Sequence, residues 1–287
     1  VVFLLYKKKY VKMFMYGENM IKLIGIDCDD TILNTNKEIS DCDALMIKKA
    51  STLKNIKCVL TTGRPFVKKT IEYYKKLGIY EENQYFIAYN GAAIYNVYTK
   101  ELLFSTTLNG KDIKEIHNIV NEYNVSHYIH KTGCICYDTL NEYSYLEKKF
   151  NDIDLYTIDF DKISDTEVAF KYMLGGDPKL IKEIFLSIPQ DIKQKYNVVI
   201  SIPCFLEFMD KRVNKWSGLV ELAKRLGIKD DEIMAIGDSM NDYEMIKNSK
   251  IGVAMENALP KIIEIADYVT SNNDDSGVGK AIRKIIF

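Results

Sequence analysis

The sequence lacks the features that mark two large classes of protein. It contains no apolar run approaching the roughly 20 residues that a membrane-spanning helix needs. It also lacks an excess of basic residues, because 39 lysines and arginines are balanced by 40 aspartates and glutamates, for a net charge of −1. Nucleic-acid-binding proteins usually carry such an excess. We therefore expect neither a membrane nor a nucleic acid as a partner.

Paired metal-binding cysteines are also missing. The six cysteines form no CxxC pair and show no zinc-like spacing with the three histidines. A metal held by His127 and His130 together with Cys134 and Cys136 is a weak alternative, because no tetrahedral ligand spacing recurs. Several cysteines lie inside apolar runs, where a free thiol behaves as a small hydrophobic residue. We therefore expect no disulfides and a cytoplasmic location.

Predicted strands and helices alternate at both ends of the 287-residue chain. The alternation runs over residues 22–91 and resumes at residue 214, and it is typical of a parallel α/β sheet. Strands predominate in between, with single elements predicted over 128–137 and 168–174, which indicates an inserted α+β domain. The predicted parts are an N-terminal tail (1–19), an α/β core (20–91 and 211–287) and the inserted domain (92–210).

The stretch Lys22–Leu33 joins an apolar run to a cluster of acids. Its first part, Leu23–Ile26, predicts a buried strand. Asp27, Asp29 and Asp30 follow, and uncompensated carboxylates are too costly to bury, so they must meet water, a cation or a phosphate-binding partner. Ligands bind at the carboxyl ends of strands in open α/β sheets. Asp27 and Asp29 are therefore the first candidates for chemistry, and an ordinary Asp-rich turn is the alternative.

Polar groups of other kinds occupy equivalent positions elsewhere in the core. They are Thr62-Gly63 after a predicted strand, Lys215 at the start of a predicted helix, and Asp238, Asn241 and Asp242 after another strand. Because parallel strand ends gather at one edge of a sheet, these groups should meet. Carboxylate oxygens suit Mg²⁺, which typically adds substrate phosphate oxygens as ligands. A lysine and a hydroxyl would balance a phosphoryl group, and an aspartate can be its nucleophile.

This ordered set of motifs resembles the haloacid dehalogenase (HAD) superfamily of phosphohydrolases. The motifs are Asp27-x-Asp29-x-Thr31, Thr62-Gly63, Lys215, and Gly237-Asp238-x-x-Asn241-Asp242. The segments TTGRP, NGA and GDSMND, together with the long insertion, resemble the Cof-type subgroup, whose members carry a cap of the C2 type. The resemblance implies an α/β fold with a Rossmann-like parallel-sheet core and an inserted α+β cap domain.

The resemblance also implies a role for each motif residue. Asp27 would attack phosphorus and form an aspartyl phosphate, while Asp29 would act as the acid and then the base. Mg²⁺ would be held by Asp27, the backbone carbonyl of Asp29 and Asp238, with Asp242 supporting the site. The phosphate-binding residues would be Thr62, Gly63, Lys215 and Asn241.

Two residues depart from the usual family pattern. Asp30 stands where the family usually has glycine, so it either adds a carboxylate near the site or points into solvent. Trp216 follows Lys215 where glycine is common, and we favour core packing over stacking on a substrate. Further candidates for a substrate contact or a hinge are Arg64, Asn90 and Gly91.

Together these observations predict a Mg²⁺-dependent phosphatase acting on a small phosphorylated metabolite, such as a sugar phosphate. One alternative is a phosphomutase of the same superfamily, which would pass the phosphoryl group to another hydroxyl. Another is a catalytically inactive regulator that binds a phosphorylated ligand, which the intact acid pair argues against. The oligomeric state and the physiological substrate stay open.

Overall fold

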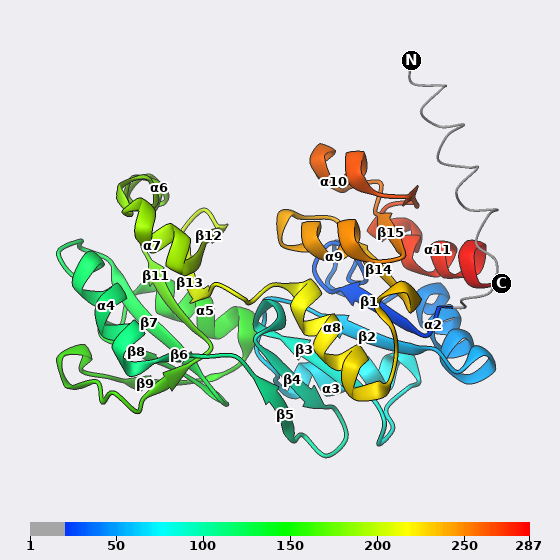
Figure 1. Cartoon of the computed structure of the whole chain (residues 1–287), viewed down its shortest axis with the longest axis horizontal. Coiled ribbons are helices and arrows are strands. Elements are labelled where there is room, and N and C mark those ends of the chain that lie inside the picture. Colours follow the sequence, from blue (N-terminus) through cyan, green and yellow to red (C-terminus); the bar gives the residue numbers. More distant parts are fainter. Residues whose placement is uncertain (1–20) are drawn as a thin grey trace. The chain divides into compact units, whose positions relative to one another are not determined.

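The computed structural model describes residues 21–287, so the tail predicted at 1–19 lies outside the described residues. The chain divides into two compact units, each with its own sheet and helices (Figure 1). The first unit comprises the described residues up to Thr62, Thr70–Glu101 and Asn214–Phe287, and the second comprises Gly63–Lys69 and Leu102–Val213. Within the described range, no helix is both long enough and apolar enough to cross a membrane.

The first unit is built on a mainly parallel sheet, with strands in the order β16-β15-β14-β1-β2-β3-β4. Their bounds are β1 (Leu23–Asp27), β2 (Lys57–Thr61), β3 (Tyr85–Ala88), β4 (Ala93–Asn96), β14 (Ile233–Gly237), β15 (Ile251–Ala254) and β16 (Tyr268–Val269). Only β4 pairs antiparallel among these, with β3. Strands β1 and β14 are neighbours, and all five residues of each are buried, as their apolar runs predict. The predicted α/β core is confirmed.

Helices cover both faces of this sheet. They are α2 (Asp41–Lys54), α3 (Lys68–Leu77), α8 (Lys215–Leu226), α9 (Tyr243–Asn248), α10 (Pro260–Ile265) and α11 (Gly277–Ile286). Helix α2 begins after Ser40, whose Oγ accepts a hydrogen bond from Asp43 N at 3.0 Å. After α2 the chain enters β2, on one side of β1, and after α8 it enters β14, on the other side of β1. Because crossovers between parallel strands are right-handed, α2 and α8 lie on opposite faces of the sheet. Helix α2 packs on α11 and α8 packs on α9.

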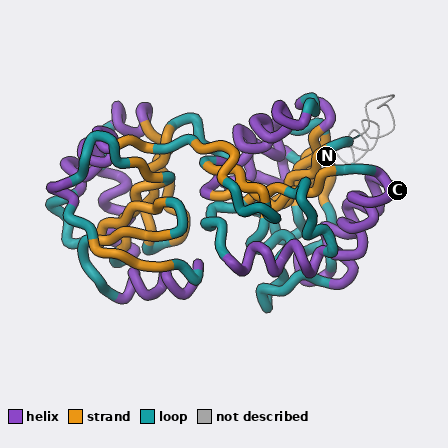
Figure 2. The backbone as a smooth tube through the Cα atoms, turned by 90° about the horizontal axis from the view of Figure 1, so that it is seen from below, coloured by secondary structure: helices purple, strands orange, loops and turns teal. Residues whose placement is uncertain are grey.

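The second unit is built on a six-stranded sheet in the order β12-β13-β11-β7-β8-β9. Its strands are β7 (Ser126–Lys131), β8 (Cys134–Tyr137), β9 (Asp154–Thr157), β11 (Lys171–Gly175), β12 (Tyr196–Ile202) and β13 (Phe205–Asp210), and the shorter strands are β5 (Leu102–Ser105), β6 (Leu108–Asn109) and β10 (Val168–Ala169). Its helices are α4 (Gly110–Val120), α5 (Glu142–Asn151), α6 (Pro178–Ser187) and α7 (Gln190–Lys195). Figure 2 shows the strands of this unit flanked by helices.

The two faces of this second sheet bury different clusters, because side chains alternate along each strand. One face carries Ile129, Tyr172 and Phe208 and packs against buried isoleucines of α4 and α6. The other carries Tyr128 and Met173, with Leu146 of α5 packed against them. The insertion is therefore an α+β structure with its own core, as predicted.

The insertion also corrects two predicted strands: residues 168–174 contain both β10 and β11, and residues 128–137 contain both β7 and β8. Strands β7 and β8 form an antiparallel hairpin, and Gly133 lies in the turn with φ +76°. Glycine adopts this left-handed backbone without a steric penalty, so the Thr-Gly pair in the middle of the stretch was the overlooked turn signal. Helix α5 was also not predicted, although Asn141 caps it by accepting from the amides of Tyr143 and Ser144.

Candidate active site

The acidic residues of the first unit meet at the carboxyl ends of β1 and β14. Asp27 is the last residue of β1, and Asp238 directly follows β14. The two strands are adjacent and parallel, with Ile26 opposite Ile236. One carboxylate oxygen from each of Asp27, Asp238 and Asp242 lies within 4.8 Å of the others. The sheet thus brings Asp27 together with Asp238 and Asp242, which lie more than 200 positions later in the chain.

Lys215 provides the positive charge at this cluster. It is the first residue of α8, which begins after Asn214, whose side chain accepts from the amide of Ser217 at 2.9 Å. Its Nζ contacts Asp27 Oδ1 directly and lies 2.5 Å from Asp242 Oδ1. Lys215 and Asp242 are completely buried, and Asp27 is only 5% exposed. Because water does not screen these charges, the ion pairs hold the three side chains firmly in place.

Asp242 has a second task besides pairing with Lys215. Its Oδ2 accepts hydrogen bonds from the backbone amides of Asp238 at 2.9 Å and Ser239 at 3.0 Å, which closes the turn after β14. Gly237 makes room for it, since a Cβ at that position would lie 2.5 Å from Asp242 Cγ. The carboxylate therefore links the turn after β14 to the lysine.

Burial, together with an excess of negative over positive charge, shifts the pKa values of the groups in this cluster. Burial raises the pKa of Asp27 well above its usual range, and the charge of Asp242 adds to this while Lys215 opposes it. Burial and Asp242 likewise raise the pKa of Asp238 to about 6. Burial alone would lower the pKa of Lys215, but Asp242 and Asp27 outweigh it and raise that pKa. Three hard oxygen donors with this charge excess fit a divalent cation.

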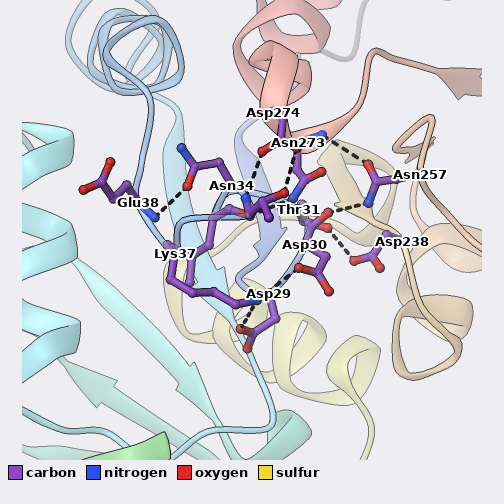
Figure 3. A network of polar contacts seen from close by, with 12 residues as sticks. Asp29, Asp30, Thr31, Asn34, Lys37, Glu38, Asp238, Asn257, Asn273 and Asp274 are labelled. Atoms are coloured by element: carbon purple, nitrogen blue, oxygen red, sulfur yellow. Dashed lines mark hydrogen bonds and ion pairs between the residues drawn. The ribbon is translucent and has the colours of Figure 1, made fainter.

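Thr31 fixes Asp238 from a distance of 207 positions along the chain. Its Oγ1 donates to Asp238 Oδ1 at 2.8 Å, and Thr31 is fully buried (Figure 3). Sequence reasoning identified Thr31 only as the end of the first motif. The signal that was available is a hydroxyl in the turn after β1, next to a strand, β14, that is followed directly by an acid.

Asp29 lies at the rim of this cluster and Asp30 lies further out. The Asp29 side chain is 35% exposed and that of Asp30 is 58% exposed. Lys37 Nζ lies 3.5 Å from Asp29 Oδ1 and 3.0 Å from Asp30 Oδ1 (Figure 3). Of the two predicted possibilities for Asp30, the structure thus shows a largely exposed carboxylate that is paired with a lysine. Lys37 was not predicted as part of the site.

The remaining predicted residues of the first unit lie on the turns beside the cluster. Thr62 follows β2 and is buried. Its carbonyl accepts from Asn90 N at 2.8 Å. Asn90 Oδ1 accepts in turn from Asn241 Nδ2 at 3.2 Å. Gly91 has φ +102°, and a Cβ there would lie 2.1 Å from the carbonyl oxygen of Asn214. This turn therefore packs directly on the start of α8.

Gly63 and Arg64 belong to the second unit, where the charge of Arg64 acts on Glu147 of α5. Burial raises the pKa of Glu147, and Arg64 is among the charges that oppose this. Trp216 of α8 is partly buried in the first unit.

Comparisons with known proteins agree with the predicted family. A family model described as haloacid dehalogenase-like hydrolase matches residues 24–282. A putative phosphatase of Bacillus subtilis, YxeH, is 33% identical over 271 residues, which cover 93% of this chain and 99% of the relative. A second B. subtilis protein, named 5-amino-6-(5-phospho-D-ribitylamino)uracil phosphatase YcsE, is 29% identical over 92% of this chain and 95% of its own length.

A solved structure is similar over the same range. The crystal structure of a haloacid dehalogenase-like hydrolase from Bacteroides thetaiotaomicron superposes with a TM-score of 0.80 at 30% identity, covering 93% of this chain and 100% of that one. The resemblance predicted from the motifs is confirmed. The chain is a hydrolase and belongs to the haloacid dehalogenase-like hydrolase family.

Proposed function

We propose that the protein is a Mg²⁺-dependent phosphatase that hydrolyses small phosphate monoesters through an aspartyl phosphate on Asp27. The observation that carries this proposal is the buried cluster in which Lys215 contacts Asp27 and Asp242, with Asp238 alongside. A buried carboxylate beside a lysine and two further acids is suited to a nucleophile at a cation site. The YxeH and YcsE relatives, both named as phosphatases, support this reaction class.

The residues that would hold Mg²⁺ are Asp27, Asp238 and the backbone carbonyl of Asp29. Asp242 is less suited as a direct ligand, because one of its oxygens pairs with Lys215 and the other accepts from two amides. When bound, the ion would supply positive charge to the phosphoryl oxygens and lower the pKa of Asp27 and Asp238. Asp242 therefore supports the site through Lys215 and the turn after β14.

The reaction proceeds in two proton-balanced steps. A carboxylate oxygen of Asp27 bonds to phosphorus as the ester P–O bond breaks, and Asp29 gives its proton to the leaving oxygen. Water then attacks the same phosphorus, Asp29 takes a proton from it, and inorganic phosphate leaves while the Asp27 carboxylate is restored. Asp29 is suited to both roles because its side chain lies at the rim, partly open to water.

Four residues would bind the phosphoryl oxygens, namely Thr62, Gly63, Lys215 and Asn241. Thr62 lies in the turn after β2, whose last residue, Thr61, is in register with Asp27. Asn241 is held by its contact with Asn90. The contribution of these groups is to orient the phosphoryl group and stabilise its developing charge.

We further propose that residues 20–91 and 211–287 form the catalytic domain and that 92–210 act as a cap selecting the leaving group. Sugar phosphates and related small metabolites are the proposed substrates, and the name of the YcsE relative supports a small phosphorylated compound. Arg64, Asn90 and Gly91 are candidates for a substrate contact or a hinge. The six cysteines are free thiols, which supports a cytoplasmic location.

The test is a screen of phosphate esters with Mg²⁺, ranked by kcat/KM, for wild type and Asp27→Asn. We expect phosphate release by the wild type, and at least about a thousandfold loss in the variant, because the covalent step has no nucleophile. Unchanged phosphate release by Asp27→Asn contradicts the nucleophile assignment. Activity that survives excess EDTA contradicts the metal requirement. Activity that appears only with an added sugar bisphosphate would point instead to a mutase.

A further inference from the structure

Asp30 occupies an unusual backbone position for a residue with a side chain. Its φ is +57°, in the left-handed region that glycine adopts most readily. Its carbonyl oxygen accepts a hydrogen bond from Asn257 Nδ2 at 2.8 Å, and its carboxylate extends toward Lys37 (Figure 3). Aspartate is among the few residues besides glycine that adopt this backbone, and here the backbone directs its carboxylate toward Lys37.

Lys37 is presented by a tight turn that closes on itself. Lys37 also has a positive φ, +60°, and its amide donates to Asn34 O at 2.8 Å. Asn34 N donates to Glu38 O at 2.9 Å, and Glu38 N donates to Asn34 Oδ1 at 2.9 Å. The backbone of Lys37 is therefore held on both sides, which limits where its side chain can reach.

The same turn is anchored to a distant part of the first unit. Thr35 donates to Asp274 through its amide at 2.9 Å and through its hydroxyl at 2.7 Å. Asn273 Nδ2 donates to Leu33 O at 3.1 Å. These contacts join the motif that carries Asp29 to a loop some 240 positions away, so the turn keeps a defined place relative to Asp29.

We propose that Lys37, held by Asp30, is a positioning residue for the Asp29 carboxylate. The inference rests on the proposed acid/base role of Asp29. An ammonium group has three donors, so Lys37 can face Asp30 at 3.0 Å and Asp29 at 3.5 Å together. A lysine restrained by two carboxylates and a closed turn has fewer available positions than one on an open surface. Asp29, which is partly exposed, thereby keeps the orientation that proton transfer needs.

The inference is tested with two substrates that differ in their need for an acid. An alkyl ester, such as the best sugar phosphate from the screen, needs its leaving oxygen protonated, whereas 4-nitrophenyl phosphate releases a stable phenolate. Since kcat/KM reports events up to the first irreversible step, misplacing the acid affects mainly the alkyl ester. We expect Lys37→Met to lower kcat/KM for the sugar phosphate about tenfold and for 4-nitrophenyl phosphate by less than about threefold.

Two further variants separate positioning from folding. Lys37→Arg keeps the charge and should recover most of the sugar phosphate activity. Asp30→Asn leaves Lys37 in place, tolerates the left-handed backbone and removes the restraining charge, so it should lower sugar phosphate kcat/KM selectively, by a smaller factor. Lys76→Met is the matched control, because Lys76 pairs with Asp41 at 2.5 Å on the same unit and is exposed to a similar degree (48% against 45% for Lys37). It should leave kcat/KM unchanged for both substrates.

The Asp29→Asn variant distinguishes the two levels of the proposal. If it leaves sugar phosphate kcat/KM unchanged, the acid/base role of Asp29 fails and with it the proposed function. Suppose instead that Asp29→Asn lowers that value, while Lys37→Met either lowers kcat/KM equally for both substrates or changes it for neither. Then only the positioning role of Lys37 is overturned. In the Asp29→Asn background, Lys37→Met should have no additional selective effect, because the group that it positions is already gone.

Discussion

Lys215 Nζ lies 2.5 Å from Asp242 Oδ1, and both side chains are completely buried. The lysine contacts Asp27 with the same ammonium group, so one positive charge faces two carboxylates. An ammonium removed from water is tolerated only with such partners. Lys215 therefore serves both stability and the proposed chemistry, because the group that would bind phosphate also allows the two acids to be buried.

Replacing Lys215 by Met should damage both properties. It leaves Asp27 and Asp242 buried without their counter-ion, and we expect a loss of about 3–5 kcal/mol in the free energy of unfolding. Phosphatase activity should fall below detection. Urea unfolding and phosphate release measure the two effects. Arg225→Met is the control, because Arg225 forms an exposed pair with Glu221 on the same helix and should change stability by less than about 0.5 kcal/mol. Equal effects of the two variants would contradict the importance of the buried pair.

Mg²⁺ should stabilise the folded protein, and more so at neutral pH than in acid. Asp238 has a pKa raised to about 6, so without metal its contribution to stability is present below about pH 4 and is lost as the pH rises through about 6. The raised pKa of Asp27 acts in the same direction. Binding Mg²⁺ requires these groups to be ionised, and it removes their mutual repulsion.

We therefore expect saturating Mg²⁺ to raise Tm by about 3–8 °C near pH 7.5 and by much less near pH 5. Scanning fluorimetry with and without EDTA measures the shift. Asp238→Asn should melt higher than wild type without metal and should show little response to Mg²⁺. A shift of the same size at both pH values, or an undiminished shift in Asp238→Asn, would count against this metal site.

Gly91→Ala should move the start of α8. A Cβ at Gly91 would lie 2.1 Å from the carbonyl oxygen of Asn214, which precedes Lys215, and φ is +102°. We expect a loss of about 2–4 kcal/mol and a fall in kcat from the displaced lysine. Gly227→Ala is the control, because φ is +68° but nothing lies within 4 Å of the new Cβ. It should lose only about 1 kcal/mol and keep its kcat. Similar kcat values for both variants would show that the contact with Asn214 is unimportant.

The second unit should lose stability in acid through His127. Tyr172 Oη lies 2.7 Å from His127 Nδ1 and 2.8 Å from His117 Nδ1. Burial lowers the pKa of His127 to about 4, with the charge of His117 adding to this and Asp138 opposing it. Because the folded pKa lies below the unfolded value, the contribution of His127 to stability is lost as the pH falls from about 6.5 to about 4.

Urea unfolding at about pH 7 and pH 5 measures this effect, which we expect to amount to about 1–2 kcal/mol from His127. His127→Gln should reduce the difference between the two pH values. Tyr172→Phe should lower stability at both pH values by about 1–3 kcal/mol, since it leaves buried ring nitrogens without a hydroxyl. An unchanged pH difference in His127→Gln would contradict the assignment.

Much of the fold was predictable because its signals are local. The apolar runs of β1 and β14 identify buried strands. Where the local signals were weaker, prediction failed. The hairpin of β7 and β8 was treated as one strand because Gly133 is a single residue within an apolar and aromatic stretch. Among the side chains of helix α5 that the structure describes, no apolar one is fully buried, so its amphipathic pattern was faint.

The sequence by itself determined the family and the order of the motifs, because each motif lies at or shortly after the end of a strand, or opens a helix. It also predicted which kinds of polar group would gather at one edge of the sheet, since parallel strands end together. Only the tertiary structure decided which of these groups touch. Three such contacts depend on side-chain positions. Thr31 holds Asp238, and Asp242 shares its two oxygens between Lys215 and a turn. Lys37 faces Asp29 and Asp30. The contact between Thr31 and Asp238 joins residues 207 positions apart, and no local pattern encodes the distance between two such atoms.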